Sequence, residues 1–368
     1  MYFVVSAGGT AGHINPAIAV ADELRRRGHR ILFVGTPDHI EAKLAVEAGF
    51  DFKGFEVSGF DAAHPLTLIT GGTKILKATS AAKAMFKVDR PDAVLTFGAY
   101  VSIPVGRAAT SLGIPLIVHE QNSVPGMANK YLAKKATVTA LTYKESAKHL
   151  EPKNEPVVIG NPVRASFETC SREAGRELLG IPQDATVLLA FGGSLGAQHL
   201  NAAVCAMKDQ LLAVDKLYIV HGTGAQDHQA VLDKLALTPA EQERYKVFEY
   251  INQMGDVLAA SDLVVSRAGA SSLAEIMTLG IPAVLVPFPY ARGDHQTLNA
   301  SGCVEAGAAC LIPDAEVEGE EFSSLVLDLV QNPTRREKMA AACKQFSGSS
   351  ARNMLADIAC NITERSRA

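Results

Sequence analysis

The hydrophobic residues of the chain fall into short uninterrupted runs rather than into alternating patterns. Such runs of Val, Ile, Leu and Ala are typical of strands that are buried on both faces of a parallel sheet. Helix-like stretches such as 16–27 and 201–212 separate them. The alternation predicts an α/β protein with helices on both faces of parallel sheets. The runs interpreted as strands are Tyr2–Val5, Arg30–Val34, Ala93–Thr96, Leu116–His119, Thr137–Leu141, Val157–Ile159, Thr186–Phe191, Leu217–His221, Val247–Tyr250, Leu263–Ser266 and Ala283–Pro287.

One pattern occurs twice along the chain. Phe3-Val-Val-Ser-Ala-Gly-Gly-Thr-Ala-Gly12 and Val187-Leu-Leu-Ala-Phe-Gly-Gly-Ser-Leu-Gly196 both read as a strand, a G-G-[ST]-x-G loop and the start of a helix. A chain of 368 residues has the length of about two domains. The repeat therefore predicts two doubly wound, Rossmann-like domains facing a cleft, over residues 1–162 and 163–344, with a last helix beyond them.

The two glycine loops indicate phosphate binding. A glycine-rich turn lets backbone N–H groups approach a phosphate, and the helix N-terminus that follows adds about half a positive charge. In the first loop we expect Asn15 to cap the helix and Pro16 to lie in its first turn. Neither loop continues as Gly-Lys-[ST] or matches G-x-G-x-x-G, so neither indicates a Walker A loop or a hydride-transfer cofactor.

The candidate catalytic residues of the first half are polar residues that follow three of its predicted strands. His13 ends the first glycine loop and has the right chemistry to remove a hydroxyl proton, although it could instead cap the helix or contact an anion. Glu120 and Asn122 follow a buried strand within His-Glu-Gln-Asn, where they could orient an acceptor or form an ordinary polar loop. Tyr100 occupies the same edge of the preceding strand.

The second half contains polar residues that could bind a nucleotide sugar. Ser271 and Ser272 could cap a helix after the strand 263–266, and Glu275 could bind a ribose diol or be a solvated helix glutamate. Gln296 and Asn299 suit sugar hydroxyls, or a capped loop–helix junction. No D-x-D and no metal-ligand spacing of Cys and His occurs in the sequence, which favours neutralisation of a diphosphate by helix N-termini and by Arg164 or Arg267.

Charge and composition bear on the partners of the protein and on its cellular compartment. Residues 1–160 carry 18 basic and 14 acidic side chains, whereas residues 161–368 carry 17 and 25. The basic stretches 72–90 and 129–150 could lie on an anionic membrane surface or be a solvated face, and overall acidity with few aromatics disfavours nucleic acid. We find no signal peptide or apolar span, and six cysteines without C-x-x-C pairing fit reduced thiols in the cytoplasm.

Taken together, the motifs resemble the MurG-type N-acetylglucosaminyltransferases of peptidoglycan synthesis, which have the two-domain GT-B fold. The resemblance runs in family order over both halves. The matching segments are Gly8-Gly-Thr-Ala-Gly-His13, His119-Glu-Gln-Asn122, Gly160-Asn-Pro-Val-Arg164, Gly192-Gly-Ser-Leu-Gly-Ala197, Arg267–Glu275, and Asp294-His-Gln296 with Asn299.

The resemblance implies metal-independent, inverting transfer of GlcNAc from UDP-GlcNAc to the 4-hydroxyl of MurNAc in lipid I. No cofactor is implied. The protein would act at the cytoplasmic face of the bacterial membrane, in contact with other cell-wall synthesis proteins, and a C-terminal helix at about 345–366 would pack on the first domain. His13 would be the base, with Glu120, Asn122, Asn129 and Tyr100 on the acceptor side; UDP-GlcNAc would contact Thr10, Ala11, Gly12, His13, Asn122, Arg164, Ser194, Ile251, Ala270, Ser271, Ser272, Glu275, Gln296 and Asn299.

Three positions depart from the family pattern, and three other functions stay open. Ala11 and Ala268 replace a common Gly and Ser, and Leu195 replaces a common Gln. The methyl group of Ala11 is tolerable if its φ is negative. A UDP-GlcNAc 2-epimerase would share the architecture without a lipid acceptor. A UDP-hexose:diacylglycerol glycosyltransferase would lack the run from His119 to Asn122, and a non-catalytic nucleotide-sugar-binding protein could lose His13 while keeping Glu275.

Overall fold

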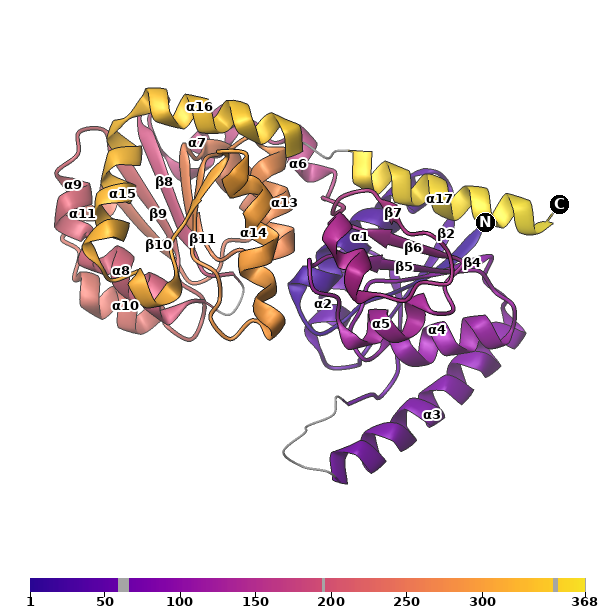
Figure 1. The fold of residues 1–368 in the computed structure, drawn as a ribbon. Coiled ribbons are helices and arrows are strands. Elements are labelled where there is room, and N and C mark those ends of the chain that lie inside the picture. Colours follow the sequence, from indigo (N-terminus) through magenta and orange to yellow (C-terminus); the bar gives the residue numbers. More distant parts are fainter. Residues whose placement is uncertain (59–65, 194–195, 347–349, 368) are drawn as a thin grey trace. The chain divides into compact units, whose positions relative to one another are not determined.

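The computed structural model describes residues 1–58, 66–193, 196–346 and 350–367, and it divides into two compact units (Figure 1). Unit 1 comprises residues 1–165 and 348–368, and unit 2 comprises residues 166–347. The boundary lies three residues after the one we expected from the sequence. Each unit contains one parallel sheet with helices packed on it, which is the α/β arrangement that the apolar runs predict.

The sheet of unit 1 has the order β3-β2-β1-β4-β5-β6-β7, and all its described strand pairs are parallel. The strand order changes direction between β1 and β4. In a doubly wound sheet this switch point, at the carboxyl ends of the strands, is where ligands bind. The strands are β1 (Tyr2–Ser6), β2 (Arg30–Gly35), β3 (Asp51–Gly54), β4 (Ala93–Thr96), β5 (Leu116–Glu120), β6 (Val138–Leu141) and β7 (Val157–Val158).

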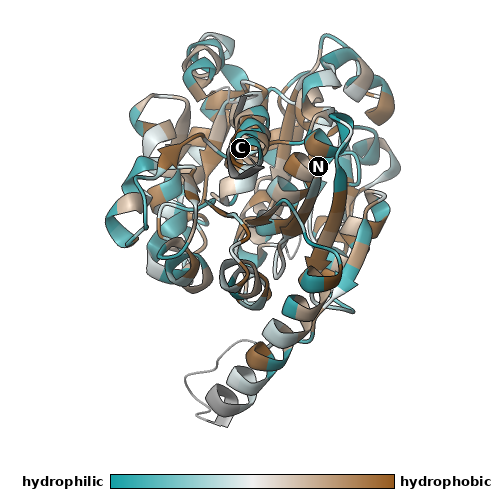
Figure 2. Ribbon diagram, turned by 90° about the vertical axis from the view of Figure 1, so that its right-hand side faces the viewer, coloured by the Kyte–Doolittle hydropathy of each residue, from teal (hydrophilic) through white to brown (hydrophobic). Residues whose placement is uncertain are grey.

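Helices cover both faces of this sheet. Phe3 and Val5 of β1 pack with side chains of α1 and α17, while Val4 packs with α3 and α4 on the opposite face. Much of the sheet is accordingly drawn in the brown of hydrophobic residues in Figure 2. The helices of unit 1 are α1 (Ala11–Arg26), α2 (Ile40–Glu47), α3 (Leu66–Val88), α4 (Ser102–Ser111), α5 (Met127–Ala133), the 3₁₀-helix η1 (Lys144–His149) and α17 (Ser350–Arg367).

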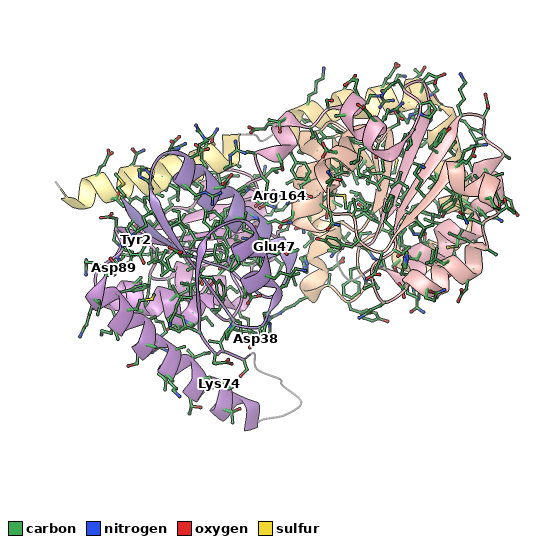
Figure 3. The ribbon with its side chains drawn as sticks, turned by 180° about the vertical axis from the view of Figure 1, so that it is seen from behind. Tyr2, Asp38, Glu47, Lys74, Asp89 and Arg164 are labelled. Atoms are coloured by element: carbon green, nitrogen blue, oxygen red, sulfur yellow. The ribbon has the colours of Figure 1, made fainter. Side chains whose placement is uncertain are left out.

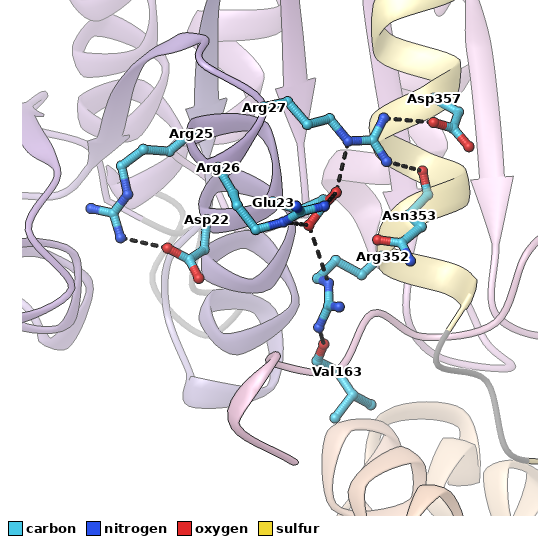
Figure 4. Close-up of polar contacts among 9 residues, drawn as sticks. All are labelled: Asp22, Glu23, Arg25, Arg26, Arg27, Val163, Arg352, Asn353 and Asp357. Carbon is cyan, nitrogen blue, oxygen red and sulfur yellow. Dashed lines mark hydrogen bonds and ion pairs between the residues drawn. The ribbon is translucent and has the colours of Figure 1, made fainter. Parts of the chain in front are cut away.

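The C-terminal helix α17 is tied to α1 by a cluster of charged groups around Glu23 (Figure 4). Arg26 and Arg27 each donate to the Glu23 carboxylate at 2.7 Å, and Arg27 also donates to Asp357 of α17 at 2.5 Å. Arg352 of α17 lies 3.9 Å from Glu23 and donates to the Val163 carbonyl at 3.2 Å. The hydrogen bond from Arg26 contributes most to lowering the pKa of Glu23 to about 2. This cluster and the apolar contacts of α17 hold the C-terminal helix on unit 1, although α17 is far from α1 in sequence.

Unit 2 has a six-stranded parallel sheet in the order β10-β9-β8-β11-β12-β13, with the switch point between β8 and β11. Its strands are β8 (Thr186–Phe191), β9 (Leu217–Gly222), β10 (Tyr245–Phe248), β11 (Leu263–Ser266), β12 (Ala283–Leu285) and β13 (Ala309–Leu311). Its helices are α6 (Ser166–Thr169), α7 (Arg172–Leu179), α8 (Gln198–Ala206), α9 (Lys208–Leu212), α10 (His228–Leu235), α11 (Pro239–Arg244), α12 (Met254–Ala260), α13 (Ala270–Thr278), α14 (His295–Glu305), α15 (Glu320–Gln331), α16 (Pro333–Cys343), and the 3₁₀-helices η2 (Arg292–Asp294), η3 (Asp314–Glu316) and η4 (Lys344–Phe346).

Several local expectations were wrong. We did not predict β3 or β13, because Asp-Phe-Lys-Gly lacks an apolar run and Ala-Cys-Leu is only three residues long. Strand β10 begins two residues before the expected 247–250. The expected helix 201–212 is divided between α8 and α9. Helix α1 begins at Ala11 with Thr10 as its N-cap, so Asn15 does not cap it and Pro16 lies in its second turn.

Candidate functional site

The loop between β1 and α1 in unit 1 has a backbone that requires glycine at two positions. Gly9 has φ +83°, in the left-handed region. A Cβ on Gly8 would lie 2.6 Å from Oε1 of Glu41. Ala11 is the first residue of α1 and its φ is negative, so the methyl group that departs from the family pattern causes no backbone strain.

His13 lies in the first turn of α1, where three segments of unit 1 meet. Its Nδ1 is 3.3 Å from the Thr10 hydroxyl. A Cβ on Gly98, which follows β4, would lie 3.0 Å from Cδ2 of His13 and 3.5 Å from the amide nitrogen of Asn129 on α5. The structure therefore brings together the predicted residues that follow β1 and β5, around a glycine that leaves room for both side chains.

Glu120 is a buried carboxylate at the end of β5, with 1% of its surface exposed. It accepts hydrogen bonds from the backbone N–H of Asn122 at 2.9 Å, the N–H of Gly126 at 3.1 Å and the amide of Asn129 at 2.9 Å. Burial raises its pKa, and these hydrogen bonds act in the opposite direction. The described contacts thus make Glu120 the organiser of the loop that carries Asn122 and of the Asn129 side chain.

His119, immediately before Glu120, is also buried. One ring nitrogen lies 3.1 Å from the Gly160 carbonyl and the other 3.2 Å from the Gln121 amide. Burial lowers the pKa of His119 to about 4, so its ring is neutral near pH 7 and braces the segment after β7. Arg164 follows that segment within unit 1 (Figure 3). Tyr100 follows β4 directly after Ala99, which has a strained φ of +64°.

The sequence analysis missed Glu41, which stabilises the first glycine loop from α2. This carboxylate is 1% exposed and accepts hydrogen bonds from the backbone N–H groups of Gly9 at 3.3 Å and Thr36 at 3.1 Å. It also occupies the space beside Gly35, where a Cβ would lie 2.5 Å from Cγ of Glu41. A glutamate one residue inside a helix gives no sequence signal for such a role.

In unit 2, the second glycine loop leads into the N-terminus of α8, and the turn after β11 leads into the N-terminus of α13. Gly193 and Gly196 have φ values of +91° and +84°, while Ser194 and Leu195 lie outside the described residues. Helices α8 and α13 begin without a side-chain cap and without an acidic residue in the first turn. The expectation that Ser271 and Ser272 cap α13 was wrong, because its N-cap is Gly269 and the serines occupy the second and third helical positions.

Two side chains cross-link the turn after β11 to the turn after β12. Arg267 donates to the carbonyls of Val286 at 3.2 Å and Pro287 at 3.1 Å. Gln296, at the start of α14, accepts from the backbone N–H groups of Ala268 at 3.2 Å and Phe288 at 2.9 Å. Because the carbonyl end of Gln296 is held in this way, its amide group has a fixed orientation at the same edge.

Asn299 supports the same edge from inside, and Glu275 lies on the helix that begins there. Asn299 is fully buried, and its amide lies 3.5 Å from the Ala268 carbonyl. Glu275 on α13 is 8% exposed, and Ala270 is the first residue of that helix at 6% exposed. Ile251, 8% exposed, follows β10 and packs beside Gly222. All these residues follow strands at the carboxyl edge of the second sheet.

Asp314 is a second residue that the sequence analysis missed. Its carboxylate, 5% exposed, pairs with Arg267 at 2.5 Å and with Nδ1 of His199 on α8 at 2.7 Å. It therefore connects the turn before α13 to the N-terminus of α8. Among the described residues, no group of three or more His, Cys, Asp or Glu side chains is arranged to hold a metal ion.

Two family models cover most of the chain. Residues 3–141 match the glycosyltransferase family 28 N-terminal domain, and residues 187–355 match the glycosyltransferase family 28 C-terminal domain. The chain belongs to glycosyltransferase family 28. Its two units, with their parallel sheets, are the two domains of the GT-B fold that this family shares with solved glycosyltransferases and epimerases.

Two full-length relatives of this family-28 chain carry the same name. A protein of Halothermothrix orenii is 40% identical over 97% of this chain and 98% of its own length, and one of Acetivibrio thermocellus is 32% identical over 100% of both. Both are named UDP-N-acetylglucosamine–N-acetylmuramyl-(pentapeptide) pyrophosphoryl-undecaprenol N-acetylglucosamine transferase. The crystal structure of MurG from Acinetobacter baumannii is 30% identical, has a TM-score of 0.76, and matches 98% of this chain and 99% of its own.

Solved epimerases resemble this chain in fold but have low sequence identity to it. A putative UDP-N-acetylglucosamine 2-epimerase from Listeria monocytogenes has a TM-score of 0.72, with 99% of this chain and 97% of its own covered, but only 16% identity. Such a likeness shows a shared architecture alone. The family-28 relatives at 32–40% identity therefore carry the functional comparison.

Proposed function

We propose that this family-28 protein transfers GlcNAc from UDP-GlcNAc to the 4-hydroxyl of MurNAc in lipid I, with inversion, and so forms lipid II. The observation that carries the proposal is the 40% identity over nearly the full length of a relative named for this reaction. The site geometry is consistent with it. Two glycine loops lie at the two switch points, one beside a histidine and one beside uncapped helix N-termini.

On the donor side, the diphosphate of UDP-GlcNAc would be bound by the N-terminal N–H groups of α8 and α13. The absence of acidic residues in the first turns of these two helices supports this role, because a carboxylate there would compete with the phosphates. Glu275 would bind the ribose and the backbone of Ile251 the uracil. Gln296 would present its oriented amide to the sugar, and Asn299 would support the turn that carries Ala268.

On the acceptor side, His13 would take the proton of the attacking hydroxyl. As the bond forms between that oxygen and C1 of GlcNAc, the bond from C1 to the diphosphate oxygen breaks and UDP leaves with its electron pair. The new negative charge on UDP is stabilised by the helix N-termini. Asn122, Asn129 and Tyr100 would position the acceptor, and Glu120 would act through the loop and the asparagine that it holds. No step assigned here requires a metal ion.

We further propose that unit 1 contacts the cytoplasmic face of the membrane, where an undecaprenyl-linked acceptor resides. Lys74, Lys77 and Lys87 are exposed on α3, and Lys74 lies near the outer end of that helix (Figure 3). Such lysines attract anionic lipids. No helix of the described residues is both long enough and apolar enough to span a bilayer. Other cell-wall synthesis proteins would meet the protein at this surface.

The test is transfer of radiolabelled GlcNAc from UDP-GlcNAc to a lipid I analogue in the presence of EDTA. Labelled disaccharide-lipid would support both the acceptor and the independence from metal. Appearance of an epimerised sugar nucleotide without labelled lipid would contradict the transferase assignment. Product that forms only after Mg²⁺ is added back would contradict only the metal-independent mechanism.

A further inference from the structure

His199 and Asp314 form a pair of side chains at the carboxyl edge of the second sheet, and the proposed reaction gives this pair no role in substrate binding. Nδ1 of His199 lies 2.7 Å from the Asp314 carboxylate, which also pairs with Arg267 at 2.5 Å. The three residues belong to segments that follow β8, β13 and β11. Because Asp314 contacts both other side chains, the ring of His199 extends from the start of α8 toward the turn that leads into α13.

The contact with Asp314 fixes the orientation of the His199 ring. A carboxylate accepts hydrogen bonds and does not donate them, so Nδ1 carries a proton and the opposite nitrogen, Nε2, points away from Asp314. The His199 side chain is 59% exposed, and it has no second hydrogen bond or ion pair within the described part of the chain. Nε2 is therefore available to a ligand in the first turn of α8, the helix whose N-terminus we assign to the donor diphosphate.

The position of the proton decides what Nε2 can bind. In the neutral ring with its proton on Nδ1, Nε2 offers only a lone pair, which repels a phosphate oxygen. The protonated ring has an N–H at both nitrogens and a positive charge. A phosphate oxygen at Nε2 of His199 therefore requires the imidazolium form. Imidazole is also the side chain whose charge ordinarily changes between pH 5 and 8.

The charges beside the ring come from three elements and oppose each other. Asp314 of η3 favours the imidazolium, whereas Arg267 and the N-terminus of α8 place positive charge nearby and favour the neutral ring. The two negative charges of an arriving diphosphate add to the effect of Asp314 and favour protonation. Other titratable side chains of neighbouring segments form no ion pair with the ring in the described structure: Asp227 and His228 at the start of α10, Glu316 of η3, and Glu320 and Glu321 of α15.

The geometry points to His199 as a proton-linked contact of the donor diphosphate. When the nucleotide sugar binds, one proton from the solvent adds to Nε2, and the new N–H donates to a phosphate oxygen. The bond between that nitrogen and hydrogen forms, and no other covalent bond changes. Asp314 is the positioning residue, because it holds Nδ1 and balances part of the imidazolium charge. This assignment rests on the proposed donor site of unit 2.

The experiment measures binding of UDP-GlcNAc to the full chain by calorimetry in two buffers of different ionisation enthalpy, because their difference gives the number of protons taken up. A phosphate monoester ionises at about pH 6, whereas the diphosphate of a nucleotide sugar keeps its charge between pH 6 and 8. His199→Leu removes the ring. The exposed His149→Leu in unit 1 is the matched control, and thermal unfolding verifies that the variants are folded.

At pH 7 the wild-type chain and the control are expected to take up a fraction of a proton that His199→Leu does not, and to bind UDP-GlcNAc about tenfold more tightly than that variant. Relative to His199→Leu, their affinity should rise by about three- to tenfold from pH 8 to pH 6, because the complex holds more protons. Uridine, which has no phosphate, should bind all three equally. Equal proton uptake, or an equal loss of uridine binding, would overturn the contact and leave the donor site standing.

Asp314→Asn tests the positioning role. The new amide can turn its NH2 group toward Nδ1, so that the neutral ring carries its proton on Nε2 and donates without proton uptake. The uptake should therefore fall to about half or less of the wild-type value. Unchanged uptake would overturn the role of Asp314. No binding of UDP-GlcNAc to the wild-type chain would overturn the donor site and the His199 contact together, whereas intact donor binding without transfer to lipid I would overturn only the proposed acceptor.

Discussion

The two glycine loops differ in the groups that support them. The net charge of each half does not predict this difference, because buried carboxylates support the loop in the basic half. The loop edge of unit 1, in the basic half of the chain, is supported by the buried carboxylates Glu41 and Glu120, which accept mainly backbone N–H groups. The edge of unit 2, in the acidic half, is supported by neutral carboxamides and by Arg267, which is paired with the buried carboxylate of Asp314. The net charge of each half therefore does not predict which charged groups support its edge.

The difference fits the two substrates that we propose. An edge that receives a diphosphate profits from helix N-termini that have no acidic residue in their first turns, as in α8 and α13. An edge that receives a neutral hydroxyl needs a base and rigid amides, and buried carboxylates can hold these without facing the phosphates. The predictions below test this division, in order of decreasing effect.

His13→Ala is expected to have the largest effect. Loss of a general base lowers turnover by about 10²- to 10⁴-fold. The UDP-GlcNAc affinity should change little, because we assign most of the donor contacts to unit 2. Transfer kinetics and calorimetry with UDP-GlcNAc measure the two quantities. The exposed His149 provides the control variant His149→Ala. Turnover close to wild type in His13→Ala would exclude His13 as the base.

Glu275→Ala is expected to weaken UDP-GlcNAc binding by about 10- to 100-fold, the usual range for hydrogen bonds to a charged group. The acceptor KM should stay within about twofold, since that substrate is assigned to unit 1. Calorimetry gives the donor dissociation constant, with the exposed Glu305→Ala as a control on the neighbouring helix. An unchanged donor dissociation constant would disprove the ribose assignment.

Glu41→Gln should affect the acceptor side alone. The new amide keeps one oxygen as an acceptor and places its NH2 against the N–H group of either Gly9 or Thr36. This loss of one buried acceptor costs about 1–3 kcal/mol and loosens the loop that precedes His13. We expect kcat/KM for the lipid I analogue to fall about tenfold with unchanged UDP-GlcNAc affinity. The exposed Glu47→Gln on the same helix is the control. A fall in thermal stability without a kinetic change would mean that Glu41 supports the fold but not the reaction.

The smallest effect concerns pH and the attachment of α17. The pKa of Glu23 is lowered from 4.5 to about 2, so its stabilisation is complete above pH 4.5 and is lost as the pH falls toward 2. Glu23→Gln should lower the free energy of unfolding by about 1–3 kcal/mol near neutral pH. Its difference from wild type should disappear near pH 2 when unfolding is followed with denaturant. A difference that persists there would contradict the ion-pair origin.

Much of the site was predictable from residues that are next to each other in sequence. The loops Gly8–Gly12 and Gly192–Gly196 are recognisable by their glycine spacing after apolar runs. His13 and Glu120 were singled out because they follow apolar strands, and Gln296 because it belongs to a polar cluster after Pro287-Phe-Pro289. The helix starts were predicted less well. Thr10 and Gly269 cap α1 and α13 in place of Asn15 and the serines, because the loop backbone sets the entry of each helix before side-chain preference can act.

The sequence by itself determined the alternation of strands and helices, the doubling of the glycine loop and the residue types at both sheet edges, since these depend on local patterns of apolar and small residues. Only the tertiary structure decided that Glu41 and Asp314 support the two edges. Glu41 accepts a backbone N–H of the first glycine loop, and Asp314 pairs with the arginine after β11. The physical reason is that a buried charge is stabilised by groups far away in sequence, and a single sequence does not record which segments fold against each other.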